Sequence, residues 1–231
     1  MIGPLVAGFS AGSVHVLAGP DHLAAVAPLA AGRVRLSWAT GMLWGVGHAG
    51  GVLLVGIGAL LLREVLPLEQ LSGWSEKLVG AVLIGIGLWG IRQARRQRVH
   101  THEHAHDDHR HAHVHVHAAE AEHVASHVHA PAAGHGHATT RAAFGVGVLH
   151  GLAGSAHFLG VIPALAFPDR SDAIVYVLMF GAGTVTSMTA FAALIGAVSM
   201  RFARDGTAFY RALLYVLGTA AIAVGVVWMA S

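Results

Sequence analysis

Six long apolar stretches dominate the chain, and each is long enough, or nearly long enough, to cross a lipid bilayer. A bilayer core of about 30 Å needs roughly 20 helical residues. The stretches run approximately from Leu5 to Ala31, Leu36 to Leu62, Leu78 to Ile91, Ala142 to Phe167, Ala173 to Met200 and Ala212 to Ala230. The third is short, and we expect its helix to begin earlier, near Leu71. Because 55% of the 231 residues are hydrophobic and only 11% are charged, the sequence predicts an all-α membrane protein with six transmembrane helices.

The positive charges predict how these helices are oriented. Eleven of the fourteen Lys and Arg residues follow the first, third and fifth stretches, namely Arg33, Arg35, Arg92, Arg95, Arg96, Arg98, Arg110, Arg141, Arg201, Arg204 and Arg211. The opposite side receives Arg63, Lys77 and Arg170. Cytoplasmic loops carry the excess of Lys and Arg. We therefore expect both termini outside and the long third gap in the cytoplasm. The membrane that we expect is a bacterial-type inner membrane.

The third gap is an insertion dominated by one residue type. Fourteen of the nineteen histidines of the chain fall between His100 and His137. A polar tract of such low complexity cannot bury a dry core, so we expect residues 94–141 to form a flexible loop that binds divalent metal loosely. The candidate ligands in its first part are His100, His102, His104, His106, His109, His111, His113, His115 and His117.

The two segments that flank this loop, residues 1–93 and 142–231, repeat each other. HVLAGPDHL from His15 aligns with HGLAGSAHF from His150, and several identical pairs share one offset of 135. Each segment contains three expected spans, an odd number, so the second enters the membrane from the opposite side. Inverted repeats with interrupted helices are a recurrent plan of transporters, which place the substrate near the midplane.

The stretch GSVHVLAGPDHLAAVAP places ionisable side chains inside the first span. An Asp at the centre of a transmembrane helix costs about 2.5–3.5 kcal/mol on insertion scales, so Asp21 is a candidate functional residue. His15 and His22 would lie roughly 10 Å apart in a continuous helix, too far to share an ion. Pro20 removes a backbone hydrogen bond, and with Gly19 it favours a break that would bring Asp21 and His22 toward His15.

Other polar groups extend this candidate site. His48 lies near the middle of the second stretch, and Thr184 is its counterpart in the repeat. The second repeat keeps His150 and His157 but lacks the Asp and the Pro of the first. We therefore assign the main metal ligands to the first repeat and His48, and a secondary or gating role to His150, His157 and Thr184. With no cysteine in the chain, imidazole and carboxylate ligands favour a borderline ion such as Ni(II), Co(II) or Zn(II).

Two of these motifs resemble signatures of a known family. HVLAGPDHLAAVAP followed by GVGHAGGVLLVG is similar to the paired signatures of the nickel/cobalt transporter superfamily, and HGLAGSAH is most similar to its six-span UreH-like branch. Five residues separate His15 from Asp21, whereas four do so in the eight-span permeases. The resemblance implies metal roles for His15, Asp21, His22 and His48. It also implies Ni(II) as the transported ion, no prosthetic group, and delivery to a cytoplasmic nickel chaperone or a urease or hydrogenase maturation protein. The His-rich loop is similar to that of related efflux proteins, so the direction of transport stays open.

Two alternatives belong to other functional classes. The protein could store or sense metal through the loop, with the helices as an anchor. It could also be a membrane hydrolase that uses Ser155 with His150 or His157. The sequence contains neither HExxH nor a GxxxxGK[ST] phosphate loop, and its arginines flank apolar spans, so we expect neither an enzyme, an ATP-driven pump nor a nucleic-acid-binding protein.

Overall fold

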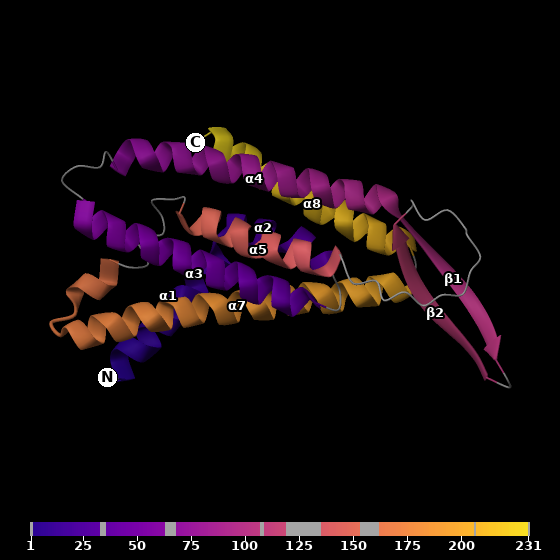
Figure 1. Cartoon of the computed structure of the whole chain (residues 1–231), viewed down its shortest axis with the longest axis horizontal. Helices are drawn as coiled ribbons and strands as arrows, with labels where there is room; N and C mark the ends of the chain where they lie inside the picture. Colours follow the sequence, from indigo (N-terminus) through magenta and orange to yellow (C-terminus); the bar gives the residue numbers. More distant parts are fainter. Residues whose placement is uncertain are drawn as a thin grey trace.

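The computed structural model describes residues 2–32, 36–62, 68–106, 109–118, 135–152, 162–205 and 207–230. Its helices are α1 (Ile2–Ala18), α2 (Pro20–Ala31), α3 (Ser37–Leu62), α4 (Leu68–Arg96), α5 (His135–Leu152), the short 3-10 helix η2 (Ile162–Ala166), α7 (Arg170–Asp205) and α8 (Thr207–Ala230). Two strands, β1 (Gln97–His106) and β2 (His109–Ala118), follow α4. Figure 1 shows the long helices running along one axis and the strands projecting from one end of the bundle.

The described helices include several that can cross a membrane. Four pass by length and composition, over Ser37–Val55, Glu76–Arg96, Arg170–Ala203 and Ala208–Ala230. The bent pair α1 and α2 passes together and makes up to five spans. The chain is therefore a multi-pass, helical membrane protein. The remaining expected span, from Ala142 to Phe167, begins within α5, continues through residues 153–161, which lie outside the described part, and ends just after η2.

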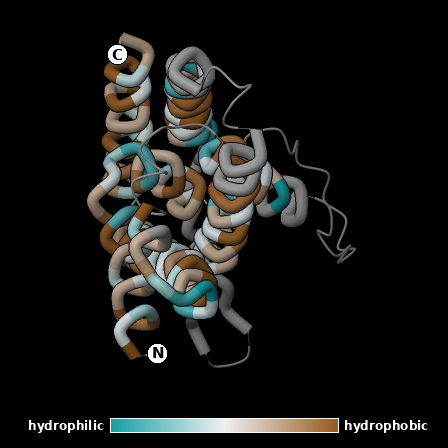
Figure 2. Tube along the Cα trace, turned by 90° about the vertical axis from the view of Figure 1, so that its left-hand side faces the viewer, coloured by the Kyte–Doolittle hydropathy of each residue, from teal (hydrophilic) through white to brown (hydrophobic). Residues whose placement is uncertain are grey.

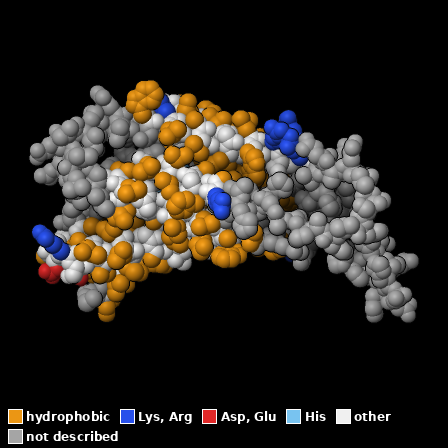
Figure 3. Space-filling view, viewed as in Figure 1, with side chains coloured by type: hydrophobic (Ala, Val, Ile, Leu, Met, Phe, Trp, Pro, Cys, Tyr) orange, Lys and Arg blue, Asp and Glu red, His pale blue; other side chains and the backbone are white. Residues whose placement is uncertain are grey.

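The outer surface of the bundle is apolar. Leu54, Leu178 and Val216 are each more than 60% exposed. Figure 2 shows hydrophobic residues along the length of the helices, and Figure 3 shows hydrophobic side chains spread across the middle of one face. Large apolar side chains exposed in this density suit contact with lipid tails rather than with water.

The short helix α2 occupies the centre of the bundle. It contacts α3, α4, α7 and α8, and every residue from Ala24 to Ala31 is buried. Five of these eight residues are alanine, whose small side chain lets neighbouring helices approach from all sides. The far end of α2 is fixed where the Tyr210 hydroxyl donates to the Ala31 carbonyl at 2.8 Å. The polar residues at the start of α2 are thereby held deep in the structure.

Paired glycines set the close approach of α4 and α8. Gly80 faces Gly225, and Gly87 faces Gly218. A Cβ atom on Gly87 would collide with the backbone oxygen of Gly218 and would lie 2.6 Å from Cγ1 of Ile222. The backbone of α8 cannot move aside as a flexible side chain can. The close approach of the two helices therefore requires glycine at this position.

Gly87→Val is therefore expected to destabilise the bundle by about 1–3 kcal/mol, the usual range for overpacking. Gly85→Val is the matched control, because nothing lies within 4 Å of a Cβ at Gly85 on the same helix. Thermal unfolding of the purified proteins in one detergent measures the effect. Equal transition temperatures for the two variants would contradict this account of the interface.

The first part of the His-rich tract forms a hairpin. β1 and β2 pair antiparallel, from Gln97 opposite Ala118 to His106 opposite His109. The sequence predicts a flexible loop for residues 94–141, and the structure instead pairs this portion as strands. The alternation of His with other residues has a period of two, which is the side-chain period of a strand.

Candidate metal site

The site begins at a break in the first membrane segment. The axes of α1 and α2 differ by 73° across Gly19. Pro20 starts α2, where its missing N–H costs no helical hydrogen bond, and Gly19 is the extended residue before it. The break that Gly19 and Pro20 predict is thus present. It turns the first residues of α2 back toward the last turn of α1.

Three histidines from three helices gather at this break. The ring centroids of His15 and His22 lie 4.7 Å apart, those of His22 and His48 lie 4.9 Å apart, and those of His15 and His48 lie 5.7 Å apart. One ligand atom from each lies within 4.8 Å of those of the other two, so the three could hold one metal ion. His15 is half-buried, whereas His22 and His48 are buried.

Asp21 connects the two halves of the chain. Its Oδ1 accepts a hydrogen bond from Nδ1 of His22 at 3.0 Å, and its Oδ2 accepts one from Nε2 of His150 at 2.9 Å. The carboxyl group lies in the first turn of α2, where the positive end of the helix dipole favours an anion. Asp21, His22 and His150 are each at most 5% exposed, and they form a second group that could hold a metal ion.

The other candidate residues from the sequence differ in how close they lie to this site. His150, assigned a secondary or gating role from the sequence, touches Asp21 directly. Thr184 is fully buried on α7, where its hydroxyl donates to the Gly12 carbonyl at 3.4 Å, and it belongs to neither ligand group. His157 lies outside the described residues. The backbone of His100 to His106 and of His109 to His117 lies in the hairpin, and the side chains of these histidines are not among those described.

Trp44 is a site residue that the sequence reasoning missed. It is fully buried, and its indole stacks on His48 with a centroid distance of 4.9 Å and an interplanar angle of 7°. Its ring also lies 5.7 Å from that of His22 and 5.4 Å from that of His150. The spacing in the sequence could have predicted this contact, because residues four apart share a helix face and Trp44 precedes His48 by four. The indole covers the cluster with an apolar surface and keeps the His48 ring in one plane.

Close helix contacts bring the second half of the chain against the first. A Cβ on Gly147 would collide with the Trp44 carbonyl, and one on Gly151 would collide with the His48 carbonyl. Because both glycines lie on α5 beside His150, they let α5 lie against α3. His150 is thereby brought within 5.7 Å of His48, measured between ring centroids.

The ligand set is chemically consistent with a borderline transition metal. Imidazole suits Ni, Co, Cu and Zn, and a single carboxylate supplies negative charge against a dehydrated cation. The hydrophobic core that includes Trp44 also contains Val16, Leu83 and Met188, so the site borders on buried apolar side chains. A divalent ion could be held here by side chains alone.

Comparison with other proteins identifies three relatives. The chain is 34% identical over 219 residues to the chloroplast protein FOR GROWTH AND FERTILITY 1 of Arabidopsis thaliana, covering 94% of this chain and 56% of that protein. It is 36% identical over 193 residues to FOR GROWTH AND FERTILITY 2 of the same plant, covering 83% and 46%. It is 29% identical over 198 residues to the urease accessory protein UreH of Bacillus sp. (strain TB-90), covering 83% and 75%.

The chain thus spans about half the length of the two plant relatives. No family model matches it, and no solved structure does. The similarity to UreH supports the resemblance to the nickel/cobalt transporter superfamily that the signature motifs carry.

Proposed function

We propose that this protein transports a divalent transition metal across a membrane, with Ni(II) as the principal substrate and Co(II) as the alternative. The observation that carries the proposal is the buried Asp21, which accepts hydrogen bonds from His22 of one half and His150 of the other. Buried ionisable groups inside membrane helices mark substrate pathways. The similarity to a urease accessory protein supports nickel as the ion.

The proposal includes two inverted repeats. It is supported by pairs of equivalent contacts, in which each half of the chain packs against the other in the same way. α1 packs on α7 as α5 packs on α3, so the corresponding helices of the two halves have equivalent partners. A Cβ on Gly12 would collide with the Phe180 carbonyl, and one on its counterpart Gly147 would collide with the Trp44 carbonyl. The same symmetry relates the contact of Gly80 with Gly225 to that of Gly218 with Gly87. The ligand cluster then lies where the repeats meet, as transporter sites do.

Uptake of radioactive nickel into proteoliposomes tests the function. Liposomes with the purified protein should accumulate nickel under an imposed gradient, and unlabelled cobalt should compete. Empty liposomes measure the leak. Nickel that binds to the protein without entering the lumen would instead favour metal storage or sensing, the candidate that the His-rich tract supports. In cells that make the protein, a rise in the cellular content of radioactive nickel would indicate import, and a fall would indicate export.

Deletion of residues 100–137 separates these candidates. We expect the deletion to lower metal loading and to weaken the response to low nickel, while transport at high nickel continues, because the tract lies between the two proposed repeats and outside both. In an importer, a cytoplasmic nickel chaperone or a urease or hydrogenase maturation protein would collect the ion near this tract. Complete loss of transport by a normally inserted deletion variant would assign the essential chemistry to the tract.

The proposed topology places both termini outside and the His-rich tract in the cytoplasm of a bacterial-type cell. The chain has no cysteine, so single cysteines can be introduced without background labelling. In intact cells, an impermeant thiol reagent should label Ser231→Cys and should spare Ala118→Cys until the membrane is opened. The reverse pattern would invert the orientation.

A further inference from the structure

The two possible ligand groups overlap at one residue. His15, His22 and His48 form one group, and Asp21, His22 and His150 form the other. We propose that a single ion occupies these two positions in turn and passes between them through His22, so the site is a two-position relay rather than one fixed cage. This inference rests on the proposed function and concerns how the same site moves its ion.

The chemistry of His22 makes the two positions mutually exclusive. A neutral imidazole carries one lone pair for a metal, because its other nitrogen holds a proton. His22 can therefore complete only one of the two groups at a time. Two divalent cations sharing this ring would also repel each other across a buried, apolar region, where such repulsion is poorly screened. One ion per chain is the expected occupancy of the site.

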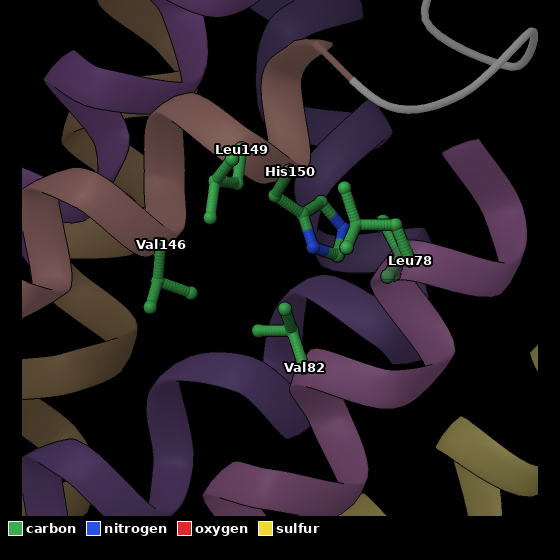
Figure 4. A pocket seen from close by; sticks show the side chains of 6 residues that line it. Leu78, Val82, Val146, Leu149 and His150 are labelled. Atoms are coloured by element: carbon green, nitrogen blue, oxygen red, sulfur yellow. The ribbon is translucent and has the colours of Figure 1, made fainter. Parts of the chain in front are cut away.

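The two positions differ in their surroundings. His15 is half-buried at the end of α1, whereas Asp21, His22 and His150 are almost completely enclosed. His150 also lines a gap between α4 and α5 that is too narrow for a water molecule. Figure 4 shows its imidazole reaching from α5 toward Leu78 of α4, with Val146 on the α5 side of the gap and Val82 on the α4 side. The first position thus faces the α1 side of the cluster, and the second faces the boundary between α4 and α5.

The donor sets also differ in charge. The first position offers imidazoles alone, and the second adds the Asp21 carboxylate. The His22 ring lies 4.7 Å from His15 and 4.9 Å from His150, so it can reach both sets without movement of a helix. An ion entering at His15 would therefore gain negative charge as it advances. To occupy the second position it would replace the protons that Nδ1 of His22 and Nε2 of His150 donate to Asp21, and in the neutral rings these protons would move to the opposite nitrogens.

The relay predicts that single substitutions affect nickel binding and nickel transport differently, which a single fixed site does not predict. His22→Ala removes both positions, so nickel affinity should fall by at least about 100-fold, beyond the 10–100-fold typical of losing an outer-shell partner. His15→Ala and His150→Ala each leave one complete neighbour set around His22 and should still bind one ion. Both should nevertheless lose transport. Ser13→Ala, on the same helix as His15, is the control and should bind and transport as the parent does.

The experiment uses the full-length chain with the histidines between residues 100 and 137 replaced by Asn, so that the tract adds no ions. Equilibrium dialysis with Ni(II) measures affinity and the number of ions, and X-ray absorption at the nickel edge measures the ligands. The His150→Ala protein should hold nickel with imidazoles from His15, His22 and His48. The His15→Ala protein should hold it with fewer imidazoles and a carboxylate oxygen.

Two ions bound per parent chain would overturn the relay, as would losses of binding in His15→Ala and His150→Ala as large as that in His22→Ala. These outcomes are independent of the transport assay. If the parent binds one ion in the predicted pattern but moves no nickel into liposomes, the proposed function fails and the two-position site stands. If nickel is transported but the binding pattern is that of one cage, the relay fails alone.

Discussion

Asp21→Asn is expected to abolish nickel transport while leaving the protein folded and inserted. Asn keeps the size of the side chain and can still hydrogen-bond with His22 and His150, but it carries no charge to offset a divalent cation. Asp21 is the carboxylate of the second ligand group, and the first group is composed of imidazoles alone. Because the imidazoles of His15, His22 and His48 remain, we expect the variant still to bind one nickel ion, as His150→Ala does, but not to transport it.

Asp169→Asn is the matched control, because Asp169 is exposed immediately before α7 and should tolerate the same chemical change. Uptake into proteoliposomes and equilibrium dialysis measure transport and affinity, and size-exclusion chromatography in detergent verifies folding. Nickel uptake by Asp21→Asn at the rate of the parent protein would require the assignment of Asp21 to be abandoned.

Gly19→Ala is expected to disable the site by steric means alone. A Cβ on Gly19 would collide with Nδ1 of His22 and would lie 2.9 Å from Oδ1 of Asp21. The backbone itself accepts alanine, because φ is −83° and ψ is 107°. The hydrogen-bonded pair of Asp21 and His22 must therefore shift to make room. Since the change displaces two ligands rather than removing one, we expect roughly a 10–100-fold loss of nickel affinity, comparable to the loss of a positioning partner.

Gly50→Ala controls for the added methyl group. Gly50 lies on α3 two residues after His48, and nothing lies within 4 Å of a Cβ built there. Dialysis should therefore find its nickel affinity close to that of the parent protein. Equal affinities for Gly19→Ala and Gly50→Ala would mean that Asp21 and His22 can move to make room for the added methyl group without loss of binding.

The sequence by itself determines the parts of this protein that depend on local chemistry. The apolar stretches predict a helical membrane protein because a bilayer core fixes the length and polarity of what can cross it. The pair Gly19 and Pro20 predicts the break, because proline lacks the N–H that a continuous helix needs. The cost of a charge in a membrane helix singles out Asp21, and the neighbouring imidazoles indicate metal chemistry. These inferences need only composition and short-range spacing.

Only the tertiary structure decides which of these groups meet. The contact of Asp21 with His150 joins residues 129 apart, and it exists because glycines on α5 let that helix lie against α3. Repeat symmetry predicts similar depth for such residues but not their separation, since a rotation of one helix by a single residue would turn His150 away. The stack of Trp44 on His48 and the central burial of α2 depend on packing in the same way. Spacing along the chain names the candidate ligands, and the close approach of helices determines which of them can share an ion.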